Sequence, residues 1–213
     1  MPETPKENKS ALAVFFRIPE YGRVKKRLAS QIGDDMALIA YQAMLYETLR
    51  NVQKLKGIDI YGFYEGSLES ARDFPKAVCY IPQKGKNLGH RMSNAVNYLL
   101  EARYKRIVMI GSDSPDLPLD FIQKAFDMLN LFELVIGPAK DGGYYLIGMG
   151  KPINQIFKGI TWGRNDVLKK TLSKANQYGI YYYLLPEWYD IDDLASLTIW
   201  LKNQRGKIND FAK

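Results

Sequence analysis

Short apolar runs alternate with longer segments of helical period along almost the whole chain. The runs are rich in Val, Ile, Leu, Phe and Tyr, which is typical of buried strands, and we predict strands at 11–16, 58–64, 77–82, 106–111, 133–139 and 180–185, with a further apolar run after the glycine pair of DGGYYLIGM. Helices are predicted between them, at 34–55, 87–104, 119–129, 165–179 and 193–204. This alternation predicts a three-layer α/β/α sandwich around a mostly parallel, Rossmann-like sheet.

The chain of 213 residues is long enough for one such domain, and it has no internal repeat and no linker rich in Pro and Gly. We expect residues 1–10 to form a flexible arm and residues 11–213 to form a single domain. In an open parallel sheet, ligands bind beyond the carboxyl ends of the strands. Candidate site residues are therefore sought in the loops that follow the strands.

Net charge narrows the class of ligand. The formal charge is +7 and the pI is about 9.3, values that suit nucleic acid, an acidic membrane surface or a small phosphorylated ligand. No nucleic-acid-reading motif is present and acidic residues are interleaved with the basic ones, so no nucleic-acid partner is expected. No apolar stretch approaches the roughly 20 residues needed to span a bilayer, so no stable membrane insertion is expected.

The cysteine content and the first residues favour a cytoplasmic location. The segment MPETPKENKS is polar and lacks the apolar core of a secretory signal. A single cysteine, Cys79, excludes an internal disulfide framework, and its place within an apolar run predicts a small core residue. The single histidine, His90, makes a Ser-His-Asp triad or a multi-histidine metal site an unsuitable interpretation.

The loop after the first strand, IPEYGRVKKRL (18–28), gathers basic residues around one glycine. Gly22, Arg23, Lys25 and Arg27 would offer cations and free backbone N–H groups to a polyphosphate at the ligand edge. The alternative is a basic surface turn that leads into a helix. The pattern is neither GxxxxGK[ST] nor GxGxxG.

The turn GSDSPDLP (111–118) follows the most strongly apolar strand. Mg²⁺ and Mn²⁺ prefer oxygen ligands, and Asp113 lies where a carboxylate at the end of a rigid strand could bind such an ion. Asp116 is better explained as the N-cap of the following helix. The alternative for Asp113 is an Asx or Ser turn without a ligand.

Two further acidic motifs follow. In AKDGGYYLIG (139–148), Asp141 is a candidate general base. The alternative is an Asp-Gly hairpin turn, which accounts for the same residues without a function. In WYDIDD (188–193), Asp190 is a candidate metal ligand, and Asp192 or Asp193 is expected to cap the last helix. Trp162 in GITWGR either stacks on a ligand or, more commonly, packs under its loop.

Six segments together resemble one family. FFRIPEYGRVKKRLA, QKGKNLGHRM, GSDSPDLP, GPAKDGGYYLIG, FKGITWGRNDVL and LPEWYDIDDLASL occur in the order seen in the bacterial glycosyltransferase-like family DUF2064, also labelled transferase 1, over about residues 11–200. The resemblance implies a glycosyltransferase-A fold of the nucleotide-diphospho-sugar transferase superfamily. It also implies a first loop that holds nucleotide and phosphate, a metal-binding aspartate at the end of the central strand and a late aspartate that completes the metal site.

Carried onto this chain, the resemblance assigns the metal to Asp113 with Asp190 or Asp192. Asp141 and Lys25 are the candidate catalytic residues. The candidate nucleotide- and phosphate-binding residues are Arg17, Gly22, Arg23, Lys25, Arg27, Gly89, Arg91, Gly142 and Gly143.

The leading function hypothesis is a transferase dependent on Mg²⁺ or Mn²⁺ that takes a nucleotide-diphospho-sugar donor and a small-molecule acceptor. The close alternative is a nucleotidyltransferase that joins a nucleoside triphosphate to a phosphorylated acceptor and releases pyrophosphate. A third alternative is a non-catalytic nucleotide-sugar binding protein.

Overall fold

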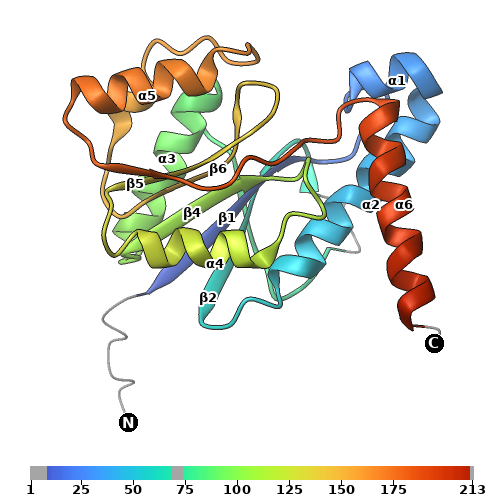
Figure 1. Cartoon of the computed structure of the whole chain (residues 1–213), viewed down its shortest axis with the longest axis horizontal. Coiled ribbons are helices and arrows are strands. Elements are labelled where there is room, and N and C mark those ends of the chain that lie inside the picture. Colours follow the sequence, from blue (N-terminus) through green and yellow to red (C-terminus); the bar gives the residue numbers. More distant parts are fainter. Residues whose placement is uncertain (1–8, 69–73, 212–213) are drawn as a thin grey trace.

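The computed structural model describes residues 9–68 and 74–211, in which helices cover both faces of one sheet (Figure 1). The strands are β1 (Ser10–Arg17), β2 (Ile58–Glu65), β3 (Cys79–Pro82), β4 (Arg106–Gly111), β5 (Leu134–Pro138), β6 (Tyr144–Met149) and β7 (Tyr182–Leu184). The helices are α1 (Lys26–Ile32), α2 (Asp34–Val52), α3 (Leu88–Glu101), α4 (Leu119–Met128), α5 (Val167–Gln177) and α6 (Leu194–Phe211), with a 3₁₀ turn η2 (Asn154–Phe157). The predicted α/β/α sandwich is confirmed.

The sheet runs in the order β3-β2-β1-β4-β6-β5-β7. β1 pairs in parallel with β2 and β4, β2 with β3, and β5 with β7, whereas β6 is antiparallel to both of its neighbours. The carboxyl ends of the parallel strands therefore meet at one edge, together with the amino end of β6.

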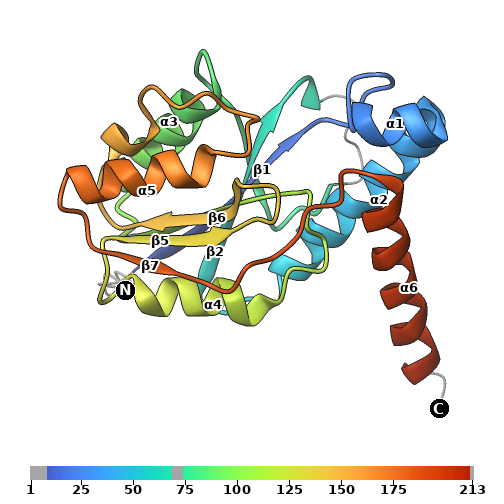
Figure 2. The same ribbon diagram turned by 45° about the horizontal axis from the view of Figure 1, so that its top comes forward.

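Alternation along β1 explains the two layers of core. Leu12 and Val14 pack in one cluster with apolar side chains of α2 and α4, and Ala11 and Ala13 pack in the other with those of α3. Figure 2 shows α3 and α5 on one side of the sheet and α4 on the other. A third, smaller cluster joins α1, the first half of α2 and α6 beside the sheet, where Trp200 is 5% exposed.

Most predicted elements are present, with corrections at their ends. The arm expected at 1–10 falls largely on residues 1–8, outside the described part of the chain, and Ser10 already belongs to β1. Helix α1 was not among the predicted helices. Cys79 is exposed at the start of the edge strand β3, so its prediction as a core residue was wrong. No helix in the described ranges is long and apolar enough to cross a membrane.

Candidate functional site

A cavity of about 730 Å³ lies at the edge where the parallel strands end. Its wall includes residues from the ends of β1, β2 and β4, Gln83 directly after β3, residues from the start of β6, from the first turn of α3 and from the segment before α6. Of the predicted site residues, it contains Arg17, Arg23, Lys25, Arg91, Asp113, Asp190 and Asp192. The topology thus brings together seven residues from four separate segments of the sequence.

The turn after β4 binds the segment that carries the late aspartates. Ser114 is 7% exposed, and its hydroxyl lies 2.9 Å from the Tyr189 carbonyl oxygen and 2.7 Å from Asp190 Oδ1, both of which can accept its proton. The backbone N–H of Ile191 donates to the carbonyl oxygen of Asp113 at 2.8 Å. These contacts place Asp190 beside Asp113.

Asp116 belongs to the same docking contact and does not cap α4. The N-cap position of α4 is Pro118, and Asp116 accepts a hydrogen bond from the Tyr189 hydroxyl. The prediction of a cap was therefore wrong, because the carboxylate finds a partner from a segment 73 residues away. At the other end of the docked segment, Asp193 caps α6: its Oδ1 accepts from the backbone N–H of Ser196 at 2.9 Å.

Asp113, Asp190 and Asp192 form an acidic group in the cavity wall, and Lys25 lies among them. Its ammonium is 2.7 Å from Asp113 Oδ1 and 2.8 Å from Asp192 Oδ1, and it donates to the Ile191 carbonyl oxygen at 2.6 Å. Burial disfavours the charged amine, but the two carboxylates outweigh it and hold the pKa of Lys25 above its ordinary value. The lysine is therefore a fixed positive charge at the cavity wall.

Within residues 9–68 and 74–211, no basic side chain forms an ion pair with Asp190. Its pKa is raised to about 6, mainly by burial and also by the negative charges of Asp113, Asp141 and Asp192, while the Ser114 hydrogen bond acts in the opposite direction. A carboxyl with this pKa changes charge near neutral pH. The cavity therefore has a region of uncompensated negative potential next to Lys25.

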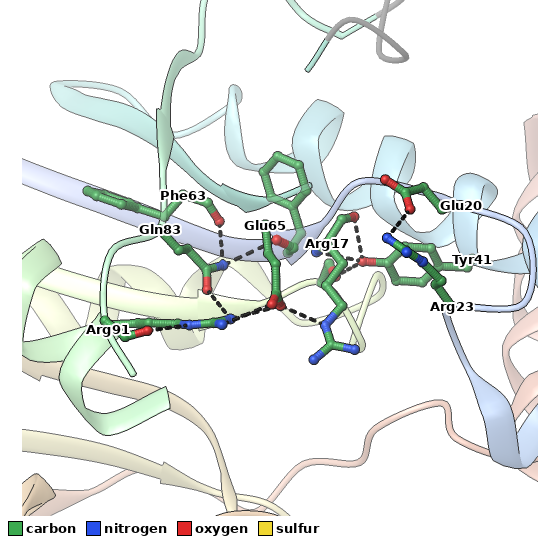
Figure 3. Close-up of polar contacts among 11 residues, drawn as sticks. Arg17, Glu20, Arg23, Tyr41, Phe63, Glu65, Gln83 and Arg91 are labelled. Atoms are coloured by element: carbon green, nitrogen blue, oxygen red, sulfur yellow. Dashed lines mark hydrogen bonds and ion pairs between the residues drawn. The ribbon is translucent and has the colours of Figure 1, made fainter. Parts of the chain in front are cut away.

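On the β2 side, one carboxylate binds two arginines (Figure 3). Glu65 Oε2 accepts from Arg17 Nε at 2.9 Å and lies 2.8 Å from Arg91 Nη1, while its Oε1 accepts from Arg91 Nη2 at 2.9 Å. The Arg91 hydrogen bonds are the main reason that the pKa of Glu65 is lowered. Gln83 links the ends of β1 and β2, because its amide donates to the carbonyl oxygens of Phe16 and Phe63 at 3.2 and 2.9 Å.

Tyr41 of α2 ties the end of β1 to the turn after β4. Its hydroxyl accepts from the Arg17 backbone N–H at 3.1 Å, donates to the Arg17 carbonyl oxygen at 3.0 Å and lies 3.4 Å from Ser112 Oγ (Figure 3). Burial raises the pKa of this hydroxyl, so it stays neutral. The tyrosine therefore fixes the position of the Arg17 backbone relative to the turn that carries Asp113.

The first loop divides its predicted phosphate-binding residues between cavity and surface. Arg23 borders the cavity but is 76% exposed and pairs with Glu20 at 2.8 Å. Arg27 is 74% exposed, lies outside the cavity wall and approaches Asp193 at 3.6 Å. Gly22 has φ 67°, the left-handed conformation that the turn requires, and its Cα faces open space.

The remaining predicted glycines lie outside the cavity wall and contact the protein itself. A Cβ on Gly89 would lie 2.8 Å from the Trp162 ring, so this glycine lets the ring lie against α3. Gly142 has φ 88°, and a Cβ there would lie 2.0 Å from the Asn165 carbonyl oxygen. Trp162 both packs against Phe157, with ring centroids 6.4 Å apart, and borders the cavity.

Asp141 is exposed at the turn before β6. Its Oδ1 accepts from the Gly143 backbone N–H at 2.8 Å, an Asx-type turn, and the residue is not part of the cavity wall. Its charge nevertheless contributes to the raised pKa of Asp190. Asp141 thus lies near the acidic group, at its solvent side.

Comparison with known proteins identifies the family. A family model described as "Uncharacterized protein conserved in bacteria (DUF2064)" matches residues 48–164, more than half of the chain. A crystal structure from Desulfovibrio desulfuricans G20, provisionally named a nucleotide-diphospho-sugar transferase, is 34% identical, with 90% of this chain and 86% of that chain covered and a TM-score of 0.83. The chain belongs to the DUF2064 family. Among curated proteins there is no match.

Other similar structures share the fold of this DUF2064 chain at low identity. One is 4-diphosphocytidyl-2C-methyl-D-erythritol synthase from Anaerococcus prevotii DSM 20548, at 11% identity, 90% and 96% coverage and a TM-score of 0.60. Another is Rv0371c from Mycobacterium tuberculosis H37Rv in complex with manganese, at 14% identity, 91% and 98% coverage and a TM-score of 0.54. The fold is that of nucleotide-diphospho-sugar transferases and cytidylyltransferases, and general sugar or nucleotidyl transfer fits it.

The donors at the acidic group of the DUF2064 chain fit a hard divalent cation. Carboxylate and carbonyl oxygens already accommodate one cation there, the Lys25 ammonium, and its single positive charge faces three carboxylates, those of Asp113, Asp190 and Asp192. Within residues 9–68 and 74–211, however, no three His, Cys, Asp or Glu side chains form a ready-made metal cage. Mg²⁺ commonly takes one or two carboxylates and fills its remaining positions with water and substrate phosphate.

Glu65, Gln83, Tyr41 and Ser114 were missed by sequence reasoning. Glu65 could have been found, because it directly follows the predicted strand IDIYGFY, and Asp113 was identified as a carboxylate in a comparable place after a strand. Ser114 was seen only as a turn residue. Gln83 and Tyr41 act through contacts with distant backbone, for which the sequence gives no signal.

Proposed function

We propose that this DUF2064 protein is a metal-dependent transferase that takes a nucleotide-diphospho-sugar as donor and passes the sugar to a small acceptor. The observation that carries the proposal is the convergence of Asp113, Asp190 and Lys25 on one cavity at the carboxyl edge of the sheet. A nucleotide with two phosphates needs a place where cations and a metal-binding carboxylate lie together. This cavity provides it.

Asp113 and Asp190 would hold Mg²⁺ or Mn²⁺, with Asp192 in contact with Lys25 beside them. When bound, the ion would neutralise negative charge that develops on the leaving diphosphate. Lys25 supplies a fixed positive charge at the same place, and for this reason we assign it a catalytic role.

Arg17 and Arg91 form the second basic part of the proposed donor site. Glu65 contacts only the Nε of Arg17, and no other residue in the described ranges contacts its terminal nitrogens, which would therefore be available to an incoming anion (Figure 3). Arg91 is held more firmly, with both terminal nitrogens on Glu65. We assign phosphate or ribose contacts to these arginines, and Arg23 adds an exposed cation at the rim of the cavity, where its side chain is 76% exposed.

Asp141 is the proposed base if the reaction inverts the anomeric centre. It lies on the solvent side of the acidic group and would take the proton of an acceptor that reaches the mouth of the cavity. The donor would then fill the cavity from within while the acceptor enters from solvent.

Charge balance favours a nucleotide sugar over a nucleoside triphosphate. The cavity wall contains four basic residues, Arg17, Arg23, Lys25 and Arg91, and four acidic residues, Glu65, Asp113, Asp190 and Asp192, so their formal charges cancel. The two negative charges of a sugar diphosphate linkage are balanced by one divalent ion. A triphosphate would leave about two negative charges unbalanced.

A nucleotidyltransferase is the second candidate, because a cytidylyltransferase from Leptospira borgpetersenii is among the structures with a similar fold. The test is incubation with Mn²⁺ and a panel of nucleotide sugars and nucleoside triphosphates with sugar phosphates. Release of a nucleoside diphosphate supports sugar transfer, whereas pyrophosphate as the only product refutes it in favour of nucleotidyl transfer. Binding without turnover would identify a non-catalytic binding protein.

The metal ligand is tested by Asp113→Ala, with Asp127→Ala on the exposed face of α4 as the control. We expect the Asp113 variant to lose metal-dependent nucleotide binding by at least about 100-fold, since a carboxylate ligand and its charge are removed together. Equilibrium dialysis with and without Mn²⁺ measures this. If Asp113→Ala bound the nucleotide as tightly as the unaltered protein does, both with and without Mn²⁺, the assignment would be refuted.

A further inference from the structure

Lys25 is the most buried basic side chain in the wall of the cavity, 5% exposed against 24% for Arg91 and 61% for Arg17. A lysine ammonium has three N–H donors, and here three oxygens accept them: Asp113 Oδ1, Asp192 Oδ1 and the Ile191 carbonyl. Each donor therefore has a partner within the protein.

The ammonium lies behind the carboxylates that it binds. Asp113 and Asp192 are 47% and 48% exposed and both border the cavity, so the buried ammonium leaves part of each side chain accessible. The backbone of Lys25 has φ 45°, a left-handed conformation that few residues other than glycine adopt. Strained backbone persists where the surroundings hold it, and here three contacts to the acidic group hold it.

We propose that Lys25 is a built-in counter-ion of the metal site that keeps the bare divalent ion out and couples its entry to that of the diphosphate. The inference rests on the proposed function, since it takes Asp113 as a metal ligand. An ion that arrives alone meets carboxylates whose charge the ammonium has partly neutralised. A diphosphate brings two negative charges next to Lys25, so ion and diphosphate enter together.

The size of the effect follows from the contact distances. Lys25 lies 2.7 and 2.8 Å from two carboxylate oxygens, and an ion on those same carboxylates would be within several ångströms of the ammonium. Even with the dielectric constant of bulk water, repulsion between a unit charge and a divalent ion about 6 Å away corresponds to about tenfold in affinity, and a lower dielectric constant makes it larger. Loss of the charge at Lys25 is therefore measurable by direct titration.

The experiment is isothermal titration of Mn²⁺ into the full chain, with and without inorganic pyrophosphate as a probe that needs no base. Lys25→Met removes the charge and keeps the length, and Lys26→Met, next to it but exposed, is the matched control. In the unaltered protein and the control we expect pyrophosphate to strengthen Mn²⁺ binding at least about tenfold. In Lys25→Met we expect bare Mn²⁺ to bind about tenfold or more tightly, and the gain from pyrophosphate to shrink.

Unchanged or weaker binding of bare Mn²⁺ to folded Lys25→Met would overturn the inference and leave Lys25 as a structural tie. If that variant does not fold, Lys25→Gln keeps a donor for the Ile191 carbonyl and gives the same reading. The unaltered protein provides a reading independent of any variant: bare Mn²⁺ bound as tightly as with pyrophosphate also overturns it. Absence of Mn²⁺-dependent pyrophosphate binding would refute the proposed function itself, which is a different result.

Discussion

Replacement of Asp190 by Asn tests whether the site stores electrostatic strain. The pKa of Asp190 is raised to about 6 from its ordinary 3.8, mainly by burial. Above pH 6 the carboxylate is ionised in both the folded and the unfolded chain, so the folded state bears the full free-energy cost of burying a charged carboxylate. As pH falls through 6 the folded protein takes up the proton first, and the cost disappears near the unfolded pKa.

The magnitude is about two pKa units, or about 3 kcal/mol at pH 8, and about half of that at pH 5. Asn is neutral at both pH values and can still accept from Ser114, so Asp190→Asn should raise the free energy of unfolding by up to these amounts. Urea denaturation followed by far-UV circular dichroism at pH 8 and pH 5 measures both. Asp127→Asn, on an exposed face of α4, is the control and should show no pH-dependent gain.

A variant that is less stable at pH 8, or whose gain does not depend on pH, would refute the reasoning. It would mean that Asp190 has a counter-charge or solvent access that its contacts do not indicate. The same variant should bind Mn²⁺ and diphosphate more weakly, because a carboxylate ligand is lost. Higher stability with lower affinity would identify Asp190 as a residue kept for binding at a cost in stability.

Two other substitutions test the surrounding structure. Gly142→Ala should lower the free energy of unfolding by about 1–3 kcal/mol, because the new Cβ would clash with the Asn165 carbonyl oxygen. Gly159→Ala is the control, since Gly159 has a positive φ of 67° but open space around its Cα. Equal losses of stability for the two variants in urea denaturation would refute the clash. Glu65→Gln should strengthen pyrophosphate binding about threefold or more in titration calorimetry at low salt, since two guanidinium groups lose their counter-charge. Weaker binding would mean instead that the carboxylate is needed to orient both arginines.

The order of strands and helices could be predicted because each element carries its own periodicity. Which strand lies at an edge is not encoded in that pattern. The run AVCYIP has the composition of a covered strand, yet β3 has a neighbour on one side only and Cys79 is exposed. Helix α1 was missed because it has only seven residues and its N-cap residue, Lys25, makes no capping hydrogen bond with its side chain. The helix is held by packing of Leu28 against α2 and α6, which the local sequence does not indicate.

For the site, sequence reasoning identified carboxylates and cations at strand ends but not which of them bind one another. Lys25 was predicted as a phosphate-binding residue, and its contact with Asp192 crosses 167 residues. Asp116 was assigned to a cap by a local rule, and a partner from a distant segment replaced that role. Local rules predict a residue's role only where no distant partner competes for the same atoms.

The turn GSDSPDLP shows how one short stretch can build a site from two ends of a chain. Its side chains Ser114 and Asp116 and the carbonyl of Asp113 are all used to dock residues 189–191. The carboxylate of Asp113 is thereby left to face the cavity and Lys25, because the backbone and the neighbouring side chains take over the structural contacts. The turn thus supplies one acidic group itself and positions a second, Asp190, beside it, so the separation between them is set by docking and not by the stiffness of either loop.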